Sequence, residues 1–343
     1  MANIILNTRC NRSCPYCFAK REMAESPSDS TMTWENLIYI ADFLKAAGQD
    51  RVSLLGGEPT LHPEFTDFVT YFLERGFDVT VFTNGLLSPT RLEECKRHLL
   101  GVRHERLSFV CNLNDPVQTP PLPGEMEKLR AFLALMGPWV SPGFNIYRLD
   151  FALDFIFDSI NRFGLKRHIR LGITHPLPGK QTSYIHPKDM RKVIRRLFSY
   201  RHLFDSTRVS PGLDCGFPIC KFTDKELGWL HRFNNPSHFR CGPAFDIAPD
   251  MSVYHCFPLS NYRRRSLFEF DSLGQLFEHF SNLRQEAKTE IPGIFDECDS
   301  CRYQESGVCS GGGLCQALSR LTNEAPVRIA EIEHELAKNR LPV

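Results

Sequence analysis

Three cysteines near the amino terminus, Cys10, Cys14 and Cys17, have the type and spacing for iron–sulfur chemistry. They form a C-x3-C-x2-C motif directly after an apolar run, residues 4–6, that predicts a strand. Three thiolates can hold three irons of a [4Fe–4S] cluster and leave the fourth iron without a protein ligand. That open iron could bind a small molecule through nitrogen and oxygen. The alternatives are a zinc site, which would need a fourth Cys or His nearby, and buried thiols without a metal.

A second motif, Gly56-Gly57-Glu58-Pro59, follows the next predicted strand, residues 51–55. The two glycines let the backbone approach a ligand closely because they carry no Cβ, and Pro59 stiffens the exit from the loop. Glu58 can accept a hydrogen bond from an ammonium group or a backbone amide. Taken alone, the motif could equally be a tight turn between a strand and a helix.

Together, the two motifs resemble the signature of the radical S-adenosylmethionine (radical SAM) enzymes. In that family the open iron chelates the methionine end of S-adenosyl-L-methionine (SAM), and the GGEP loop contacts its amino group. The resemblance implies that the three cysteines are catalytic cluster ligands. It also implies that the GGEP residues and Tyr16, the aromatic residue before the last cysteine, lie at the cofactor.

Four more residues are predicted SAM contacts because they follow later strands, where members of the family contact the cofactor. Asn84 lies in a Thr-Asn-Gly turn and Asn112 follows the fourth predicted strand, so that both would meet the ribose or the carboxylate. Arg148 could hold the carboxylate with two hydrogen bonds, and His175 could line the adenine pocket. Each could instead be an ordinary turn or loop residue.

The composition is that of an ordinary globular protein, with 42% hydrophobic residues, 24% charged residues and a net charge of +1 over 343 residues. Nucleic-acid partners are not expected, because proteins that bind them carry a clear basic excess. No stretch approaches the roughly 20 apolar residues of a membrane span, and no secretory signal is present. We expect a cytoplasmic protein whose 13 cysteines stay reduced; two of them, Cys95 and Cys111, are predicted core residues.

The first half of the sequence alternates short apolar runs with helical periodicity, which predicts repeated βα units around a parallel sheet. We expect an α/β fold, a partial (β/α)6 TIM-like barrel, with its chemistry at the carboxyl ends of the strands. The predicted strands cover residues 3–6, 51–55, 78–82, 107–111, 144–149 and 168–173. The predicted helices cover residues 33–47, 63–75, 125–135, 151–163 and 188–204.

The pattern changes after about residue 185, where long periodic segments give way to Cys, Gly, Pro and aromatic residues. We expect the radical SAM barrel to occupy residues 1–185 and a bridging region to occupy residues 186–235. A small cysteine-rich α+β domain is predicted over residues 236–322. We expect bound metal to stabilise it, because such a segment would not readily form an apolar core alone. Residues 323–343 predict a charged terminal helix.

Eight cysteines gather in the second half, and a [4Fe–4S] cluster with all-cysteine ligation needs four. They are Cys215, Cys220, Cys241, Cys256, Cys298, Cys301, Cys309 and Cys315. From residue 241 onward their spacing resembles the SPASM extension, which carries auxiliary iron–sulfur clusters in many radical SAM enzymes. The later gaps are longer than the family pattern, Met251 stands where a glycine is usual, and no cysteine follows Cys315.

By analogy, Cys241, Cys256 and Cys315 would bind one auxiliary cluster. They are the first two cysteines and the last cysteine of this spacing. The other cluster would take the three between them, Cys298, Cys301 and Cys309. How Cys215 and Cys220 divide between the two clusters stays open. The alternatives are a structural zinc ribbon and the shorter twitch arrangement, with one cluster on Cys241, Cys256, Cys298 and Cys301.

The resemblance implies an oxidoreductase that reductively cleaves SAM to a 5′-deoxyadenosyl radical, which takes a hydrogen atom from the substrate. Auxiliary clusters would carry electrons, and the product would be a crosslink, a dehydrogenation or an epimerisation. The favoured substrate is a ribosomally made peptide (a RiPP precursor). The alternatives are a small-molecule dehydrogenase or epimerase in a natural-product pathway, a sulfatase activator, and a non-catalytic iron–sulfur electron carrier or zinc scaffold.

Two further partners are expected. Radical SAM chemistry needs an electron donor such as flavodoxin or ferredoxin. The first predicted strand lies almost at residue 1, which leaves no room before it for a leader-peptide-binding domain. A peptide substrate would then bind the open side of the barrel directly or be presented by a separate leader-recognition protein.

Overall fold

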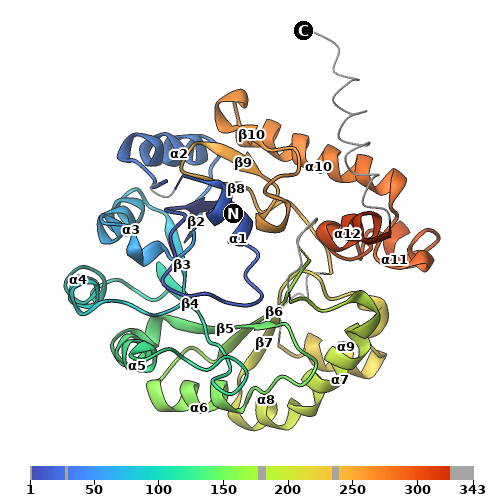
Figure 1. Ribbon diagram of the computed structural model, residues 1–343, viewed down its shortest axis with the longest axis horizontal. Coiled ribbons are helices and arrows are strands. Elements are labelled where there is room, and N and C mark those ends of the chain that lie inside the picture. The colour runs from blue at the N-terminus through green and yellow to red at the C-terminus, as the bar shows by residue number, and fades with distance from the viewer. Residues whose placement is uncertain (1, 28–29, 177–182, 234–238, 325–343) are drawn as a thin grey trace.

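The computed structural model describes residues 2–27, 30–176, 183–233 and 239–324 of the chain, and the fold is α/β. Within these ranges ten strands form one sheet, in the order β10-β9-β8-β1-β2-β3-β4-β5-β6-β7. Figure 1 shows this sheet as an inner arc with helices around its outside. The strands are β1 Ala2–Ile5, β2 Arg51–Leu55, β3 Asp78–Thr83, β4 Leu107–Asn112, β5 Val140–Ile146, β6 His168–Ile173, β7 Ser210–Leu213, β8 Asp246–Ile247, β9 Ser252–Tyr254 and β10 Arg265–Ser266.

All neighbouring strands from β8 through β1 to β7 pair in parallel, and only the β8–β9 and β9–β10 pairs are antiparallel. The two edges, β10 and β7, are not paired with each other, so the barrel is open. The helices are α1 Lys20–Glu25, α2 Trp34–Ala46, α3 Phe65–Glu74, α4 Pro89–Leu99, α5 Glu125–Met136, α6 Asp154–Phe163, α7 Met190–Ser199, α8 Arg201–Thr207, α9 Asp224–His231, α10 Leu273–Glu290, α11 Arg302–Glu305 and α12 Leu314–Glu324.

Local sequence explains where several helices begin and end. Thr33 caps α2 by accepting a hydrogen bond from the Asn36 amide, and Ser88 caps α4 in the same way. Pro89 stands at the first position of α4, where a missing N–H costs nothing. Gly164 ends α6 in the left-handed conformation, with φ of 62°.

The main hydrophobic core lies between the outer face of the sheet and these helices. Strands β3 and β4 alternate buried residues, such as Val79, Val81 and Phe109, with half-buried ones that face the barrel interior. Cys95 and Cys111 are fully buried in this core, which confirms their prediction as core residues.

The predicted α/β fold is confirmed, but several elements differ from the prediction, and helix α4 was not among the predicted helices. Strand β5 begins at Val140, four residues before the predicted start, and the segment predicted as one helix over 188–204 forms two, α7 and α8. A seventh parallel strand, β7, extends the sheet beyond the six predicted. It was missed because Ser210-Pro211-Gly212 has the composition of a turn, although an edge strand tolerates proline.

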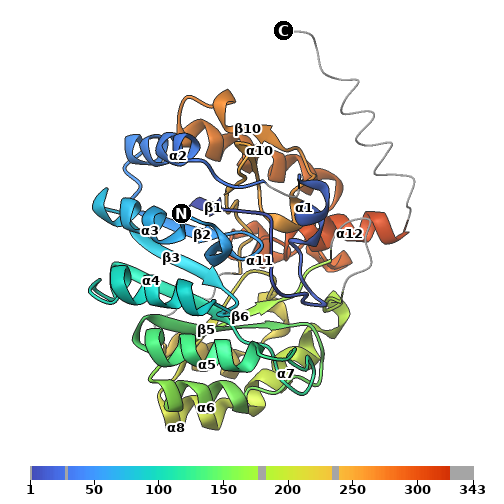
Figure 2. The same ribbon diagram turned by 60° about the vertical axis from the view of Figure 1, so that its left-hand side comes forward.

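The carboxyl-terminal part of the chain returns to the amino-terminal strand. Strand β8 pairs with the free edge of β1, and Asn3 Nδ2 donates to Asp246 Oδ1 at 2.6 Å. Helices α10 to α12 then lie on the open side of the arc in both Figure 1 and Figure 2. Most of the predicted terminal helix, residues 325–343, lies outside the described residues. No helix in the described ranges is both long and apolar enough to cross a bilayer.

Candidate active site

The cysteine loop follows β1, at the carboxyl end of the parallel strands. Cys10, Cys14 and Cys17 are all half-buried, and the Cys17 amide donates to the Cys14 carbonyl at 3.2 Å. Two asparagines reach the sulfurs from the neighbouring strand ends: Asn84 Nδ2 is 3.8 Å from Cys10 Sγ, and Asn114 Nδ2 is 3.7 Å from Cys14 Sγ. The loop is therefore held by side chains that follow β3 and β4.

Two of these thiols do not favour the anionic state on their own. Burial, with the charges of Glu58, Cys17 and Cys14, raises the pKa of Cys10 to about 12. Burial also raises the pKa of Cys17, and the Cys14 charge adds to that effect. Thiolates at Cys10 and Cys17 therefore need a positive partner, which is what a metal group supplies.

The GGEP loop packs directly beneath the cysteine loop. The amide of Gly57 donates to the Asn7 carbonyl at 2.9 Å, and that of Glu58 donates to the Arg9 carbonyl at 2.7 Å. A Cβ on Gly56 would lie 2.3 Å from the Asn7 oxygen, and one on Gly57 would lie 2.2 Å from the Arg9 oxygen. Both glycines are thus required by the close approach of the segment that leads into Cys10.

The Glu58 carboxylate is buried and already satisfied by the protein. Oε1 accepts from the Thr60 amide at 3.2 Å, the Thr60 hydroxyl at 2.7 Å and the Thr83 hydroxyl at 2.7 Å. Oε2 accepts from the Asn84 amide at 2.7 Å. Burial raises the pKa of Glu58, and these donors oppose the rise. Glu58 therefore ties the GGEP loop to the Thr-Asn-Gly turn, while Pro59 begins a short 3-10 turn, Pro59–Leu61.

Asn112 ends β4 on the inner face of the barrel. Its Oδ1 atom is buried and has no hydrogen-bond partner. Gly143 on β5 makes room for that oxygen, since a Cβ at Gly143 would lie 2.6 Å from it. A buried acceptor without a donor costs about 1–3 kcal/mol, so this position fits a ligand that offers a hydroxyl or an amine.

Tyr16 is buried beside the cysteine loop. Its hydroxyl donates to Asn114 Oδ1, and its ring lies 4.9 Å from that of Tyr147. The Tyr147 hydroxyl in turn bonds Thr119 Oγ1 at 2.7 Å. Tyr16 therefore connects the cysteine loop to the ends of β4 and β5.

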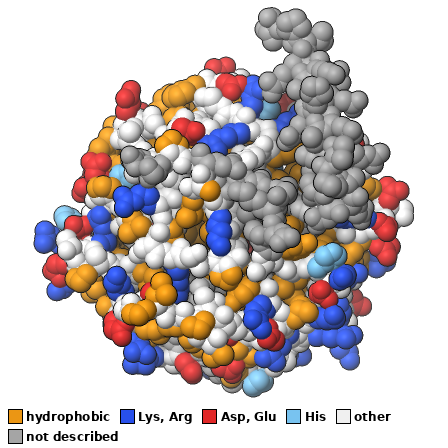
Figure 3. Space-filling view, in the orientation of Figure 1, with side chains coloured by type: hydrophobic (Ala, Val, Ile, Leu, Met, Phe, Trp, Pro, Cys, Tyr) orange, Lys and Arg blue, Asp and Glu red, His pale blue; other side chains and the backbone are white. Residues whose placement is uncertain are grey.

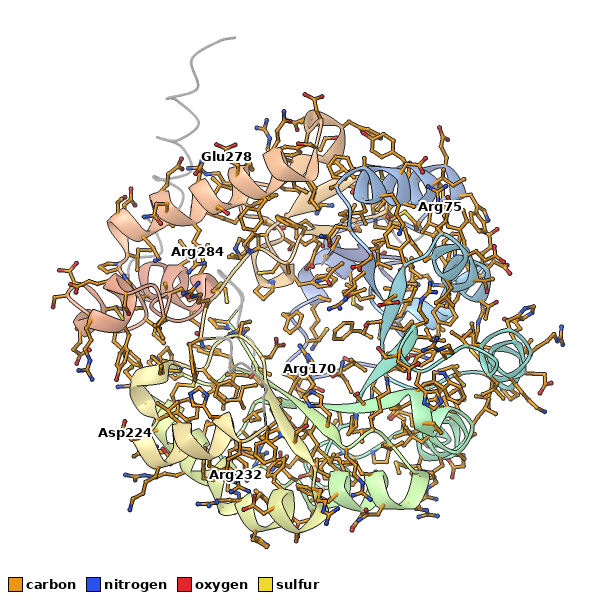
Figure 4. All side chains as sticks on the ribbon, turned by 180° about the vertical axis from the view of Figure 1, so that it is seen from behind. Arg75, Arg170, Asp224, Arg232, Glu278 and Arg284 are labelled. Atoms are coloured by element: carbon orange, nitrogen blue, oxygen red, sulfur yellow. The ribbon has the colours of Figure 1, made fainter. Side chains whose placement is uncertain are left out.

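The structure also brings an ion pair that we did not predict into the barrel. Arg170 extends from β6 into the interior, where Figure 4 shows it near the centre of the molecule, and it pairs with Asp214 directly after β7. Its guanidinium lies 5.3 Å from the ring of Phe82, which packs against the same hydrophobic cluster as Cys17. The sequence of β6 did carry a signal for this position of Arg170. Side chains alternate between the two faces of a strand, and this alternation places Arg170 on the inner face.

Two residues predicted to contact the cofactor have partners within the protein. Arg148 is half-exposed after β5 and makes two hydrogen bonds to Asp150, of 2.9 and 2.8 Å. His175, after β6, is buried, and its Nε2 lies 3.5 Å from the sulfur of Cys215. Burial lowers the pKa of His175 to about 4, so the ring is neutral at neutral pH.

The helix that follows the cysteine loop is fixed by the carboxyl-terminal part of the chain. Glu22 of α1 is buried, and Arg264 Nη1 donates to both of its carboxylate oxygens, at 3.0 and 2.8 Å. Arg264 also bonds both oxygens of Asp250, at 3.2 and 3.1 Å. The cysteine loop is therefore braced from both halves of the chain.

The eight later cysteines lie in the carboxyl-terminal part and at the end of β7. Cys241, Cys256 and Cys315 share a small hydrophobic cluster with residues of α10 and α12. The remaining cysteines of that region, with Cys220, line one pocket: Cys220, Cys298, Cys301 and Cys309. On the face seen in Figure 3, charged side chains gather at the rim, and the centre is mostly hydrophobic side chains and backbone.

A sequence profile of the radical SAM superfamily matches residues 4–104. The chain therefore carries a radical SAM domain in its amino-terminal part. A curated S-adenosylmethionine-dependent nucleotide dehydratase from Selenomonas ruminantium is 37% identical over 87 residues, which are 25% of this chain and 30% of that protein. Molybdenum cofactor biosynthesis protein 1 of Homo sapiens is 32% identical over 85 residues, 24% of this chain and 13% of that protein. The chain thus spans less than a third of these relatives.

Solved structures are similar over most of the chain. anSMEcpe with bound AdoMet and a Kp18Cys peptide has a TM-score of 0.62 and 16% identity, covering 97% of this chain and 99% of that one. SuiB of Streptococcus suis, bound to S-adenosylmethionine, has a TM-score of 0.61 and 16% identity, covering 91% and 72%. At these identities the similarity establishes the fold: an open, mostly parallel barrel of the radical SAM kind.

Proposed function

We propose that this protein is a radical SAM oxidoreductase that cleaves SAM reductively and abstracts a hydrogen atom from its substrate. The observation that carries this proposal is the meeting of Cys10, Cys14 and Cys17 with the GGEP loop and Asn112 at one end of an open barrel. When bound, a [4Fe–4S] cluster with one iron free of protein ligands supplies the electron that splits SAM into methionine and a 5′-deoxyadenosyl radical.

The residues at this end fit those two groups. Cys10, Cys14 and Cys17 would hold the cluster, because they are three converging thiols with asparagine donors at two of the sulfurs. The backbone at Gly56 and Gly57 and the ring of Tyr16 would border SAM. The unpartnered Oδ1 of Asn112 would accept a hydrogen bond from its ribose. Glu58 and Asn84 keep these loops in place.

Arg170 and Asp214 form the substrate end of the site in this proposal. Arg170 lies over Phe82 on the inner side of the cysteine loop, and Asp214 directly precedes Cys215. The Arg170 guanidinium would orient the substrate. Asp214 Oδ2 would accept the proton that the substrate loses when it is oxidised after hydrogen abstraction.

A peptide is the substrate class we favour. Two solved structures of similar fold are described with peptides: anSMEcpe with the Kp18Cys peptide and SuiB with its precursor peptide SuiA. The sheet of this chain does not close between β10 and β7. The product would be a crosslink, a dehydrogenation or an epimerised residue, and a separate protein could present the peptide.

A small-molecule substrate is the second candidate. Curated relatives in the radical SAM part include a nucleotide dehydratase and, in Limosilactobacillus fermentum, a GTP 3′,8-cyclase. These similarities cover about a quarter of the chain, so they bear on SAM cleavage more than on the substrate. A dehydrogenase or epimerase acting on a small molecule would use the same ion pair at Arg170.

The proposal includes two auxiliary clusters on the eight later cysteines and an external electron donor such as flavodoxin or ferredoxin. Loss of an electron by the substrate needs an acceptor near Asp214, and Cys215 follows it directly. Three clusters would bring about twelve irons to each chain, at four per cluster. A zinc scaffold would instead contain zinc and no acid-labile sulfide.

Anaerobic reconstitution tests the core of this function. The full chain is loaded with iron and sulfide, reduced with dithionite and given SAM, and 5′-deoxyadenosine is measured by chromatography. We expect 5′-deoxyadenosine from the native protein and none from Cys14→Ala. Cys301→Ala should retain part of the cleavage and lose product formation. Absence of 5′-deoxyadenosine from an iron-loaded native protein would refute the proposal.

The substrate class is tested in the same assay by mass spectrometry. Short peptides encoded beside the gene and a panel of nucleotides are incubated separately with the reduced protein and SAM. A crosslink or dehydrogenation removes two hydrogens from the substrate, and an epimerisation in D2O adds one deuterium. Turnover of nucleotides without turnover of peptides would favour the second candidate.

A further inference from the structure

Four cysteines, one of them far from the other three in the sequence, line one pocket at the carboxyl-terminal side. They are Cys220, Cys298, Cys301 and Cys309, and the pocket encloses about 270 Å³, open solvent included. Its other lining residues are mostly apolar or glycine, such as Pro218, Ile219 and Ile294. Of these four cysteines, only Cys220 precedes residue 236, where the cysteine-rich domain is predicted to begin.

The backbone around Cys220 is anchored so that the cysteine stays at the pocket. Cys220 lies in a short 3-10 turn, Ile219–Lys221. Arg191 of α7 donates to the Lys221 carbonyl at 2.9 Å. The Lys221 ammonium lies 4.0 Å from the centre of the Phe295 ring, on the opposite wall of the pocket. The turn is thus tied both to the barrel and to the segment that carries the other three cysteines.

The backbone at Gly293 lies very close to Cys298, which lines the pocket. A Cβ on Gly293 would lie 2.7 Å from Cys298 Cβ and Sγ, and the Ile294 amide donates to the Gly311 carbonyl at 2.9 Å. The Cys309 amide donates to the Tyr303 carbonyl at 2.9 Å. These contacts hold residues 293–311 around the pocket that Cys220 also lines.

Three of the other four cysteines form a separate group beside the barrel, and the fourth, Cys215, lies just after β7. Cys241, Cys256 and Cys315 share one hydrophobic cluster, and the Leu314 amide donates to Cys241 Sγ at 3.4 Å. Cys215 is in contact with His175 at the end of β6.

A [4Fe–4S] cluster with all-cysteine ligation needs four thiols. One pocket brings four together, Cys220 with Cys298, Cys301 and Cys309. This leaves Cys215 as the fourth thiol for the other group. The two groups therefore fit the two auxiliary clusters of the proposed function, on which this inference rests.

We propose that Cys220 completes the cluster on Cys298, Cys301 and Cys309, and that Cys215 completes the one on Cys241, Cys256 and Cys315. Cys220 then takes the place of the cysteine that the SPASM pattern would supply after Cys315. The two clusters differ in surroundings. Cys220 is exposed, whereas Cys215 is half-buried and contacts His175.

Paired serine variants of the full chain test this assignment by iron content and by EPR of the dithionite-reduced protein. Addition of SAM first identifies the signal of the SAM cluster, since only that one should change. We expect Cys220→Ser and Cys309→Ser to alter or remove the same auxiliary signal. Cys215→Ser and Cys256→Ser should affect the other. Removal of a cluster lowers the iron content from about twelve to about eight per chain.

A ligand exchange keeps the test informative if serine variants fail to accumulate. Cys220→Asp leaves an oxygen ligand on the surface turn and should shift one auxiliary signal without loss of iron. The assignment is overturned if Cys220 variants change the signal that Cys256→Ser changes, or if they change no signal. Native protein that lacks three clusters, or that yields no 5′-deoxyadenosine, would instead count against the proposed function.

Discussion

The ring of His175 lies against the sulfur of Cys215, with 3.5 Å between Nε2 and Sγ. Gly216 makes this contact possible, because a Cβ there would lie 2.4 Å from His175 Cε1. The other ring nitrogen, Nδ1, is buried without a partner. Since burial holds the ring neutral, with a pKa of about 4, its single N–H can be directed to the sulfur.

Replacement of His175 should therefore change the reduction potential of the cluster that Cys215 binds. Hydrogen bonds to cluster sulfurs favour the reduced state, so His175→Phe should lower that potential while iron content stays at the native value. EPR-monitored redox titration measures the shift. His168→Phe, at the start of the same strand, is the control and should leave the potential unchanged. Equal shifts in both variants would contradict a specific role for His175.

The Arg170–Asp214 pair should matter for the substrate and not for SAM cleavage. Asp214→Asn removes a proton acceptor, and such groups contribute about 10²-fold or more to rates. We expect product formation to fall by about that factor, while 5′-deoxyadenosine formation falls less than about threefold. Both are measured in the same assay once a substrate is known.

The matched control is Arg148→Met, which removes an arginine from an exposed pair with Asp150. Exposed ion pairs contribute little to stability, and we expect both SAM cleavage and product formation to stay near native levels. A large rise in the KM for SAM would instead support the sequence-based prediction that Arg148 holds the cofactor carboxylate.

Gly57→Ala should disrupt the site at its base. The added Cβ would lie 2.2 Å from the Arg9 carbonyl oxygen, so the cysteine loop must shift, at a cost of about 2 kcal/mol or more. We expect a lower melting temperature and loss of the SAM-responsive EPR signal. Gly101→Ala is the control, because a Cβ there meets nothing within 4 Å. Equal behaviour of the two variants would show that this close approach is unimportant.

Asp246 should make stability fall as pH rises. Burial raises its pKa to about 7, so between about pH 4 and 7 the folded chain holds a proton that the unfolded chain has lost. Asp246→Asn should remove this dependence. The free energy of unfolding of the variant minus that of the native chain should therefore rise by on the order of 4 kcal/mol from pH 4 to 8. Denaturant unfolding at several pH values measures it.

Asp250→Asn provides a control of opposite sign. Although burial opposes it, hydrogen bonds from Ser252 and the charge of Arg264 lower the pKa of Asp250 overall. This group therefore adds stability that is lost as pH falls, and its replacement should flatten the acid side of the profile. A native profile that stays flat between pH 4 and 7 would contradict the prediction for Asp246.

The sequence was sufficient to predict the strands that carry a clear pattern. The predicted strands over 51–55 and 168–173 match β2 and β6 residue for residue, because buried β-branched and leucine residues dominate them. Pro142 obscured β5, and the Pro-Gly pair at 211–212 obscured β7. In both strands, pairing with neighbours overrides local propensity.

The candidate site was likewise only partly predictable from the sequence. The spacing of Cys10, Cys14 and Cys17 is local and could be recognised directly. The pairing of Arg170 with Asp214 and the contact of His175 with Cys215 join segments about 40 residues apart. No local pattern encodes which strand ends meet, so these relationships needed the fold.

The pairing of β8 with β1 also has a consequence for how the protein is made. Residues 3 and 4 pair with residues 246 and 247, so β1 keeps one unpaired edge until residues more than 200 positions further along the chain have been translated. The cysteine loop is attached to that strand. Its final shape, and therefore metal loading in the cell, should be a late event that follows synthesis rather than accompanying it.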